Sequence, residues 1–394
     1  MRIRLTTAQA EYLGLTVKEK KNDGSGYPKY SISDAQFQKL QEFKDSLKDS
    51  SDIVKIQLEN DNQPVHQTKF YWAKTENGSY QITNPHYKEL KPIDDFLNAE
   101  FITEIVKSYI KPAPKFTKKV TESRWKDRLV ISDVHINMNN HGGSNKLPIY
   151  DNPLYDEAEI FRRLEATINH VVTFQRGENI IIDNLGDFMD GEKGQTTRGG
   201  HALPQLYSDK KAFEIAVKFK IDLVENLLKY YNVITLNNII DDNHSFLMSY
   251  YVHSTAKKVL ELKYPGRVIY NINECFISEY FIGDHRFVIS HGKDSVEMKF
   301  GWKPKLDDKL VKAIDGYLKH KKLYDGKVIE VSKADSHQYL SDFTTSLDFE
   351  YHTYPAFSPP SSWVQHGFGN SRSGVIMQHI DLKSRTKSVT PLFF

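Results

Sequence analysis

Apolar runs of strand length alternate with stretches of helical period from residue 129 to the end of the chain. The helical stretches are EIFRRLEATINHVV, KKAFEIAVKFKIDLVENLLKYY and KLDDKLVKAIDGYLKHKK, and the first carries Ile160, Leu164 and Val171 on one face. Between them lie the apolar runs LVIS, NIIIDNL, NVITLN, HRFVIS and KVIEVS, each of which predicts a buried strand. Such alternation is typical of an α/β domain with largely parallel sheets. It is completed by a hairpin of CFISEYFIG and HRFVIS and by two C-terminal strands, SGVIMQHIDL and SVTPLFF.

The first third of the chain follows a different pattern. Thr6 is placed to cap a short helix, and Ser33 to cap a second helix with an apolar stripe. Three alternating segments follow, VKIQLEN, TKFYWAKT and GSYQITN, which predict short strands. Helices followed by a hairpin suit a winged helix-turn-helix, so residues 1–110 are predicted to form a small α+β domain with nucleic-acid binding as its candidate role. Residues 111–127, rich in lysine and proline, are predicted as an exposed linker, and residues 128–394 as the α/β domain.

Composition adds limits on the class of protein. The hydrophobic fraction of 39% and charged fraction of 26% are ordinary for a chain that buries a core. No run is long and apolar enough to span a bilayer, and the N-terminus lacks a signal-peptide core, so a cytoplasmic location without membrane contact is expected. The single cysteine excludes an internal disulfide framework or a thiolate zinc cluster, and the apolar run around Cys275 predicts a buried thiol. The net charge of +2 leaves partners to be judged from local clusters.

Polar side chains of metal-binding type follow five of the predicted strands. LVIS leads to Asp133 and His135, NIIIDNL to Asp187 and Asp190, NVITLN to Asn243 and His244, HRFVIS to His291, and KVIEVS to Asp335 and His337. Each residue alone has an ordinary structural interpretation, as a surface group, a turn residue or a hydrogen-bonded histidine. Loops at the carboxyl ends of parallel strands meet in one crevice, so five coincidences at five strand ends favour a shared site. Carboxylate, imidazole and amide groups together predict a cage for hard or borderline metal ions.

The order D-x-H, G-D-x-x-D, N-H, H-G and a terminal histidine motif resembles that of the calcineurin-like metallophosphoesterases over roughly residues 125–394. The resemblance implies an α/β fold in which a β-sandwich is flanked by helices, with two divalent metal ions as cofactors. It implies one metal bound by Asp133, His135 and His337, a second bound by Asn243 and His291, and Asp187 as the bridge. It further implies that a metal-activated hydroxide attacks the phosphorus in line, while an unligated His244, supported by Asp190, protonates the leaving group.

Two positions depart from the family pattern. The family usually ends its cage with G-H-x-H, whereas this chain has Ala334-Asp335-Ser336-His337, so aspartate replaces the first histidine. A carboxylate ligand makes the second metal site harder, which favours Mn²⁺, with Mg²⁺ or Fe²⁺ as alternatives, over Zn²⁺. In the alternative interpretation, Asp335 only hydrogen-bonds a neighbour and the site is weakened. The second departure is Asp242, which stands where glycine is common, and the sequence leaves open whether its side chain points into the cage.

Residues around the motifs bear on the class of phosphoester. Gly191 stands where phosphoprotein phosphatases carry an arginine, which favours the phosphodiesterase branch that includes DNA-repair nucleases. Arg198, His201 and Lys293 are candidate substrate-binding residues beside the cage. Two basic segments favour nucleic acid, with DNA preferred, although lysine runs are usually just solvated faces. They comprise Lys111, Lys115, Lys118, Lys119 and Arg124 before the first motif, and Lys303, Lys305, Lys309, Lys312, Lys319, Lys321 and Lys322 before the last.

Aromatic residues near the C-terminus have two interpretations. Tyr351, Tyr354, Trp363 and Phe368 form either a stacking wall for bases or a loop packed on the domain. His352, His366 and His379 have no partner motif and are interpreted as structural.

Three functions therefore remain open from the sequence. The leading hypothesis is a two-metal phosphodiesterase acting on DNA as a nuclease. A small-molecule or cyclic-nucleotide phosphoesterase is the enzymatic alternative, and a non-catalytic metal-binding scaffold is the third.

Overall fold

A computed structural model of the chain divides into two compact units, Met1–Lys91 and Pro92–Phe394, which are described separately. The structure describes residues 2–4, 13–15, 29–40, 70–75, 78–83, 98–110, 123–142, 149–150, 152–197, 200–292, 298, 300, 304–368 and 371–394. Within these residues no helix is long and apolar enough to span a bilayer.

The described part of the first unit contains a capped helix and two strand pairs. The strands are β1 (Arg2–Arg4), β2 (Lys29–Ser31), β3 (Phe70–Thr75) and β4 (Gly78–Thr83), paired antiparallel as β1–β2 and β3–β4. Ser33 caps a helix over residues 34–40 by exchanging hydrogen bonds with Gln36, as in a capping box. The Ser33 cap and the strands from TKFYWAKT and GSYQITN are thus confirmed. The helix expected after Thr6 and the strand VKIQLEN lie outside the described residues, and the winged-helix hypothesis stays a prediction.

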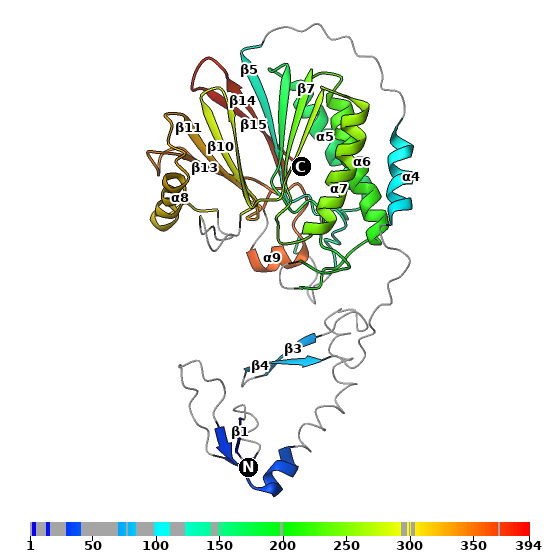
Figure 1. Ribbon diagram of the computed structural model, residues 1–394, viewed down its shortest axis with the longest axis vertical. Helices are drawn as coiled ribbons and strands as arrows, with labels where there is room; N and C mark the ends of the chain where they lie inside the picture. The colour runs from blue at the N-terminus through cyan, green and yellow to red at the C-terminus, as the bar shows by residue number, and fades with distance from the viewer. Residues whose placement is uncertain are drawn as a thin grey trace. The chain divides into compact units, whose positions relative to one another are not determined.

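The second unit is built on two facing sheets (Figure 1). The six-stranded sheet has the order β15-β14-β5-β6-β7-β8, and the five-stranded sheet has the order β12-β13-β11-β10-β9. The first comprises β5 (Trp125–Ile131), β6 (Asn179–Asn184), β7 (Val233–Ile239), β8 (Val268–Asn273), β14 (Gly374–Asp381) and β15 (Lys387–Phe393). The second comprises β9 (Ile277–Ile282), β10 (His285–Ser290), β11 (Val328–Lys333), β12 (Leu340–Asp342) and β13 (Glu350–Thr353). Strands β5 to β8 are parallel, as are β10, β11 and β13, so their carboxyl ends point the same way within each sheet.

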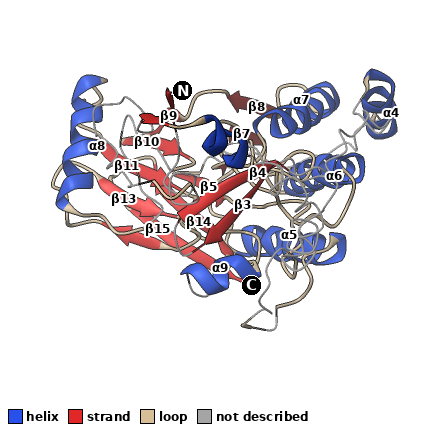
Figure 2. Ribbon diagram, turned by 90° about the horizontal axis from the view of Figure 1, so that it is seen from below, coloured by secondary structure: helices blue, strands red, loops and turns tan. Residues whose placement is uncertain are grey.

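Helices cover the outer faces of both sheets, which confirms the predicted β-sandwich flanked by helices (Figure 2). The described helices of this unit are α4 (Ala99–Tyr109), α5 (Glu157–Thr173), α6 (Asp209–Leu227), α7 (Phe246–Lys263), α8 (Asp308–His320) and α9 (Ser362–Phe368). Helices α5, α6 and α7 lie beside the six-stranded sheet and α8 beside the five-stranded sheet. Asp156, Ser208 and Asp307 cap α5, α6 and α8, each by accepting a hydrogen bond from a backbone N–H of the first helical turn.

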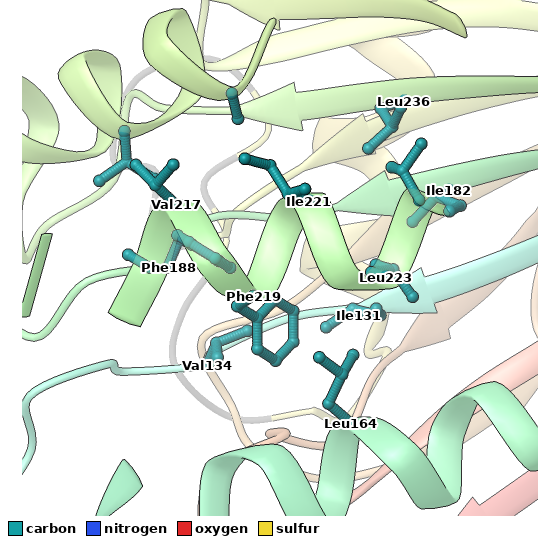
Figure 3. Close-up of a cluster of buried hydrophobic side chains, with 14 of the residues drawn as sticks. Ile131, Val134, Leu164, Ile182, Phe188, Val217, Phe219, Ile221, Leu223 and Leu236 are labelled. Atoms are coloured by element: carbon teal, nitrogen blue, oxygen red, sulfur yellow. The ribbon is translucent and has the colours of Figure 1, made fainter. Parts of the chain in front are cut away.

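Three apolar clusters hold these layers together. The largest lies between the helices and the six-stranded sheet and includes Phe188, Phe219 and Leu164 (Figure 3). A second joins the facing sheets through residues such as Val130 of β5 and Phe287 of β10. The third packs α8 on the outer face of the five-stranded sheet. The sandwich is therefore a packed core, and polar groups inside it need partners.

Two details differ from the sequence prediction. Residues 99–109 were assigned to the N-terminal module, but α4 belongs to the second unit because Phe101 is buried in its core, 6.1 Å from the ring of Phe213. The predicted buried thiol is wrong, because Cys275 is exposed in the connection between β8 and β9. An apolar run can predict a strand without showing that each of its residues faces the core.

Arg128 of β5 is fully buried between the two sheets. Its Nε donates to Asp183 Oδ2 at 2.7 Å on the neighbouring strand β6, and its Nη1 donates to Glu330 Oε1 at 2.5 Å on the facing strand β11. The same Nη1 donates to Gln378 Oε1 at 2.8 Å on β14, and the guanidinium lies 4.4 Å from the Phe287 ring centroid. One cation thus links strands of both sheets through charge-assisted hydrogen bonds.

Replacing Arg128 with methionine should lower the free energy of unfolding by about 3–5 kcal/mol, because Asp183 and Glu330 would be left buried without their cation. Chemical denaturation followed by near-UV circular dichroism would measure the change. Arg385→Met is the matched control: its guanidinium makes one exposed hydrogen bond to Gly326 O, and its loss should change stability by less than about 0.5 kcal/mol. Equal stability of the Arg128 variant and the control would show that the buried network is not stabilising.

Lys220 of α6 is a second buried cation, behind the loop that follows β6. Its Nζ donates to Asn238 Oδ1 at 3.1 Å and lies 4.2 Å from the Phe188 ring centroid. Burial lowers the pKa of this amine to about 7, because a desolvated ammonium is unfavourable and no carboxylate compensates.

The stability difference between wild type and Lys220→Met should consequently depend on pH. Between about pH 7 and pH 10.5 the unfolded chain binds a proton at this lysine that the folded chain does not, so wild-type stability rises with pH relative to the variant. The slope should approach about 1.4 kcal/mol per pH unit in that window and vanish below it. Denaturant unfolding of both proteins from pH 6 to pH 9, checked for retained structure, would measure it; a pH-independent difference would contradict the buried neutral amine.

Candidate metal centre

Residues at the carboxyl ends of five strands come together at one end of the sandwich. Asp133 and His135 follow β5, Asp187 follows β6, and Asn243 follows β7 in the six-stranded sheet. The five-stranded sheet contributes His291 after β10, and Asp335 and His337 after β11. Ligand atoms within 4.8 Å of one another form three overlapping groups: Asp133, His135 and His337; His135, Asp187 and His244; and Asp133, Asp187 and His291. The predicted convergence is therefore present, and it requires both sheets.

The first half of the cage is formed by Asp133, His135, His337 and Asp187. His337 Nε2 lies 3.2 Å from Asp133 Oδ1, and His135 Nε2 lies 4.0 Å from the same oxygen. His135 Nε2 also lies 3.8 Å from Asp187 Oδ2. These separations leave the nitrogen and oxygen atoms around a common centre, as ligands of one divalent ion are arranged.

The second half is formed by Asp187, Asn243, His291 and Asp335. His291 Nε2 lies 3.3 Å from Asp187 Oδ2 and 2.9 Å from Asn243 Oδ1. Asp335 Oδ1 lies 3.8 Å from the same nitrogen, so the aspartate that replaces the expected histidine has its carboxylate in the cage. Asp187 Oδ2 is close to both His135 and His291, which is the position that a bridging ligand requires.

Hydrogen bonds on the far side of the imidazoles orient them toward the cage. His291 Nδ1 lies 2.9 Å from Leu185 O, and His135 Nδ1 lies 3.0 Å from Asp190 Oδ1. Because a carbonyl or carboxylate accepts the Nδ1 proton, Nε2 is the nitrogen that each ring presents to a metal. Asp190 is thus a supporting carboxylate behind His135.

Buried polar atoms without hydrogen-bond partners also fit a bound cation. Among the described residues, Asp133 Oδ2, His135 Nε2, Asp187 Oδ1 and Asp335 Oδ2 are buried and accept or donate no hydrogen bond. Leaving such groups unpaired costs on the order of 1–3 kcal/mol each, and more when they are charged. These four unpaired atoms belong to expected ligands of the cage, and divalent metal ions would provide their missing partners.

The backbone is strained at the expected ligand residues of the cage. Positive φ angles occur at five of the expected ligands: Asp133 (50°), His135 (48°), Asp187 (46°), Asp335 (63°) and His337 (53°). This left-handed region is sparsely populated by non-glycine residues and costs of order 1–3 kcal/mol per residue, so it concentrates at functional sites. Gly186 explains the close approach of two loops, because a Cβ there would lie 2.8 Å from His291 Nδ1. The left-handed conformation at these turns directs the ligand side chains into a shared space.

His244 lies between two carboxylates, the bridging Asp187 and the supporting Asp190. Its Nε2 is 3.6 Å from Asp187 Oδ2, and its Nδ1 is 3.0 Å from Asp190 Oδ1. Burial alone would lower the pKa of this imidazole, but the carboxylates of Asp187 and Asp190 outweigh it and raise the pKa to about 9. The side chain keeps 17% of its surface exposed, so solvent reaches the imidazole at the edge of the cage.

Asp242 points inward but acts on the backbone. Its Oδ2 accepts from Asp187 N at 3.0 Å, and its Oδ1 accepts from His244 N at 3.1 Å and Ser245 N at 2.9 Å. Sequence reasoning left this orientation open. Asp242 therefore ties the loop after β7 to the loop after β6, which fixes the spacing between His244 and Asp187.

Other predicted residues fall outside the cage. Arg198 and Lys293 lie outside the described residues, and His201 is exposed in the segment between Asp190 and α6. The stacking wall is wrong for Tyr351 and Tyr354, because both are fully buried and the Tyr354 hydroxyl donates to Glu330 Oε1. The structure does not describe the side chains of Trp363 and Phe368.

A further group of possible ligands, Glu330, Glu350 and His352, is already filled by a cation of the chain. Lys387 Nζ donates to both carboxylates and lies 3.4 Å from His352 Nε2. The ammonium of Lys387 thus occupies the place of an ion, and His352 is structural, as expected.

Adding Mn²⁺ to chelator-treated protein should raise the midpoint of thermal unfolding, because the cage binds the ion only in the folded state. Asp187→Asn should abolish most of that rise, since the bridge would lose its charge. Differential scanning fluorimetry against Mn²⁺ concentration would measure both. Asp315→Asn, on the outer surface of α8, is the control and should keep the wild-type response. A midpoint of thermal unfolding that does not change with Mn²⁺ concentration would contradict a metal cage.

Comparisons with known proteins find only distant structural similarity. No family model and no curated sequence matches the chain. Solved structures similar to it include Vps29 of Entamoeba histolytica complexed with Zn²⁺ (8% identity, TM-score 0.28, 68% of this chain and 98% of that one). They also include a 5′-nucleotidase of Candida albicans (10%, 0.29, 71% and 53%) and the sulfate thiohydrolase SoxB of Thermus thermophilus (10%, 0.29, 70% and 58%). The chain thus spans little more than half of the latter two.

The strand order, the parallel strand ends and the converging ligands carry the assignment of the fold. Every motif that suggested the resemblance lies at the strand end where it was expected, and the ligands come from both sheets. The second unit thus has the architecture that the resemblance to the calcineurin-like metallophosphoesterases implies: two facing sheets with candidate ligands at five strand ends.

Proposed function

We propose that the protein is a two-metal phosphodiesterase that cleaves phosphodiester bonds in DNA. The observation that carries the proposal is the arrangement of His244, which lies beside the bridging Asp187 without being one of the expected ligands. Its side chain is 17% exposed, whereas His135 and His291 turn their Nε2 atoms into the cage. A metal cage with an unligated imidazole beside it is suited to hydrolysis of phosphoesters.

Two divalent ions, when bound, would neutralise phosphate oxygens and lower the pKa of a shared water to give a nucleophile at neutral pH. The residues of the chain provide the rest. Asp187 offers oxygens to both halves of the cage, and Asn243 adds a neutral ligand that does not repel an anionic substrate. Asp190 Oδ1 lies 3.0 Å from His244 Nδ1, so its charge favours the protonated imidazole that would supply a proton to the leaving oxygen.

The residue after Asp190 supports a diester rather than a phosphoprotein substrate. Gly191 has a φ of 86°, and a Cβ there would lie 2.6 Å from Gln195 O and 2.7 Å from Leu203 Cδ1. An arginine of the phosphoprotein-phosphatase type has no room at this position. The cage therefore lacks that contact for a terminal phosphate.

Basic residues of α8 and its flanks support a polynucleotide substrate. Lys305, Lys309, Lys312, Lys321 and Lys322 are exposed, and His320 adds to them. Leu310, Ile314 and Leu318 bury the opposite face of the helix, so the lysines are held outward on a rigid element. Such a surface binds backbone phosphates without sequence preference, and the affinity falls steeply with salt.

Asp335 supports Mn²⁺ as the working metal and an active rather than vestigial cage. In the scaffold hypothesis the altered Asp335 site no longer holds the second metal; the position of Asp335 Oδ1, 3.8 Å from His291 Nε2, supports ligation instead. An additional oxygen ligand favours harder ions such as Mn²⁺, Mg²⁺ or Fe²⁺ over Zn²⁺.

Hydrolysis of bis-p-nitrophenyl phosphate and of single-stranded oligodeoxynucleotides should disappear in excess chelator and return best with Mn²⁺. His244→Ala should lower kcat by about 10²–10⁴-fold, the usual contribution of a general acid, while the metal content stays at the wild-type level. Steady-state kinetics with elemental analysis of the same samples would test both statements. Full activity in chelator would sink the metal mechanism, and loss of metal from the His244 variant would make this residue a ligand.

A further inference from the structure

The described residues between Asp190 and α6, 191–197 and 200–207, form an insert next to the loops that carry His135 and His244. It folds back on itself through hydrogen bonds from Glu192 N to Gln195 O and from Leu203 N to Gly194 O, at 2.9 and 2.7 Å. Isolated bridges join Gln195 to both Glu192 and Ala202. The glycine conformation of residue 191 starts this reversal directly after the carboxylate that supports His135 and His244.

The insert is also fastened to the loop that carries His135. Asn139 N donates to Pro204 O at 3.0 Å, and Leu206 N donates to Asn137 O at 3.2 Å. Gln205 Nε2 donates to the backbone oxygen of Asp190 at 2.7 Å. These three bonds hold the insert to two different strand-end loops, so its position relative to the cage is set by the backbone.

One edge of the insert contacts the proposed general acid. Thr197 N donates to His244 O at 2.9 Å. The preceding residue, Thr196, is paired with His201 in both directions: Thr196 N donates to His201 O, and His201 N donates to Thr196 Oγ1, each at 2.9 Å. Paired backbones lie about 5 Å apart, so the His201 backbone lies about 5 Å from that of Thr196 and farther than Thr197 from His244.

The exposure and chemistry of His201 suit an anionic group of the substrate. The residue is exposed, whereas the nearby carboxylates of Asp187 and Asp190 are buried under the imidazoles of the cage. An imidazole offers an N–H donor at every pH and a positive charge when protonated. A phosphate beside His201 would gain a donor at the rim without approaching the buried carboxylates.

The insert is bound to the backbone of His244, the residue proposed to protonate the leaving oxygen, so the His201 backbone lies on the same side of the cage as His244. We infer that His201 is a specificity-determining residue that binds the phosphate next to the scissile one, within the part of the strand that leaves. This inference rests on the proposed phosphodiesterase function. The substrate it selects is an oligonucleotide whose leaving fragment carries a phosphate, over a diester whose leaving group has none.

Two substrates with the same chemistry and different leaving groups test the inference in the full chain with Mn²⁺. His201→Ala should raise KM for a short oligothymidylate by roughly ten- to a hundredfold, as expected for a hydrogen bond to a charged group, with kcat nearly unchanged. KM and kcat for bis-p-nitrophenyl phosphate, whose leaving group bears no phosphate, should stay at wild-type values. His201→Lys, which restores a cationic donor, should recover most of the oligonucleotide affinity.

His141→Ala is the matched control, because His141 is another exposed histidine, on the neighbouring loop, where its Nε2 lies 2.8 Å from Asn152 O. It should leave both substrates unaffected. Equal slowing of both substrates by His201→Ala would show a structural role and overturn the inference, as would no effect on either. If the wild type cleaves the small diester but no oligonucleotide, the leaving-group assignment fails while the cage chemistry stands. If it cleaves neither, the proposed function itself fails.

Discussion

The cage depends on the distance between two sheets that share no backbone hydrogen bond in the described residues. Asp133, His135, Asp187 and Asn243 belong to one sheet, and His291, Asp335 and His337 to the other, so a small shift of one sheet would separate the two ligand sets. Arg128 opposes that shift by bonding to Asp183 in its own sheet and to Glu330 in the facing one. Lys387 of β15 repeats the connection to Glu330 and Glu350. A packed apolar layer tolerates sliding better than directed, charge-assisted bonds do, so these two cations set the register that the cage needs.

Strain at the ligands is held by bonds between the strand-end loops. Asp133 N donates to Gly186 O and His135 N to Asp187 O, so the first and second motifs support each other's backbone. Ala334 N donates to His291 O, which does the same for the second sheet. Asp242 then joins the β6 and β7 loops through its carboxylate. A ligand-bearing turn keeps a positive φ angle where surrounding contacts hold its backbone in place. Here hydrogen bonds from the neighbouring strand-end loops hold these turns.

Much of this arrangement follows from sequence patterns, and the part that does not has a physical reason. Strands, parallel strand ends and converging motifs were predictable because apolar runs and polar termini are local signals. The sequence shows Asp242 only as an unusual charge, since whether this carboxylate binds a metal or three backbone N–H groups depends on φ and ψ of a loop. Tyr354 carried the same aromatic signal as a base-stacking residue, yet its hydroxyl completes the Arg128 network. Helix α7 escaped prediction because its polar and apolar residues show little helical segregation.

Asp335 connects the electrostatics of the cage to the same inter-sheet layer. Replacing a neutral imidazole by a carboxylate adds one negative charge among Asp133 and Asp187, and such a cluster needs positive charge nearby. Lys333, buried at the end of β11, supplies part of it: burial lowers the pKa of this amine to about 8, and the attraction of Asp335 and Asp133 opposes that loss of charge. Divalent ions in the cage would balance the remaining negative charge. A site with this balance should hold its second metal more tightly, and prefer a harder ion, than a histidine-terminated cage of the same geometry.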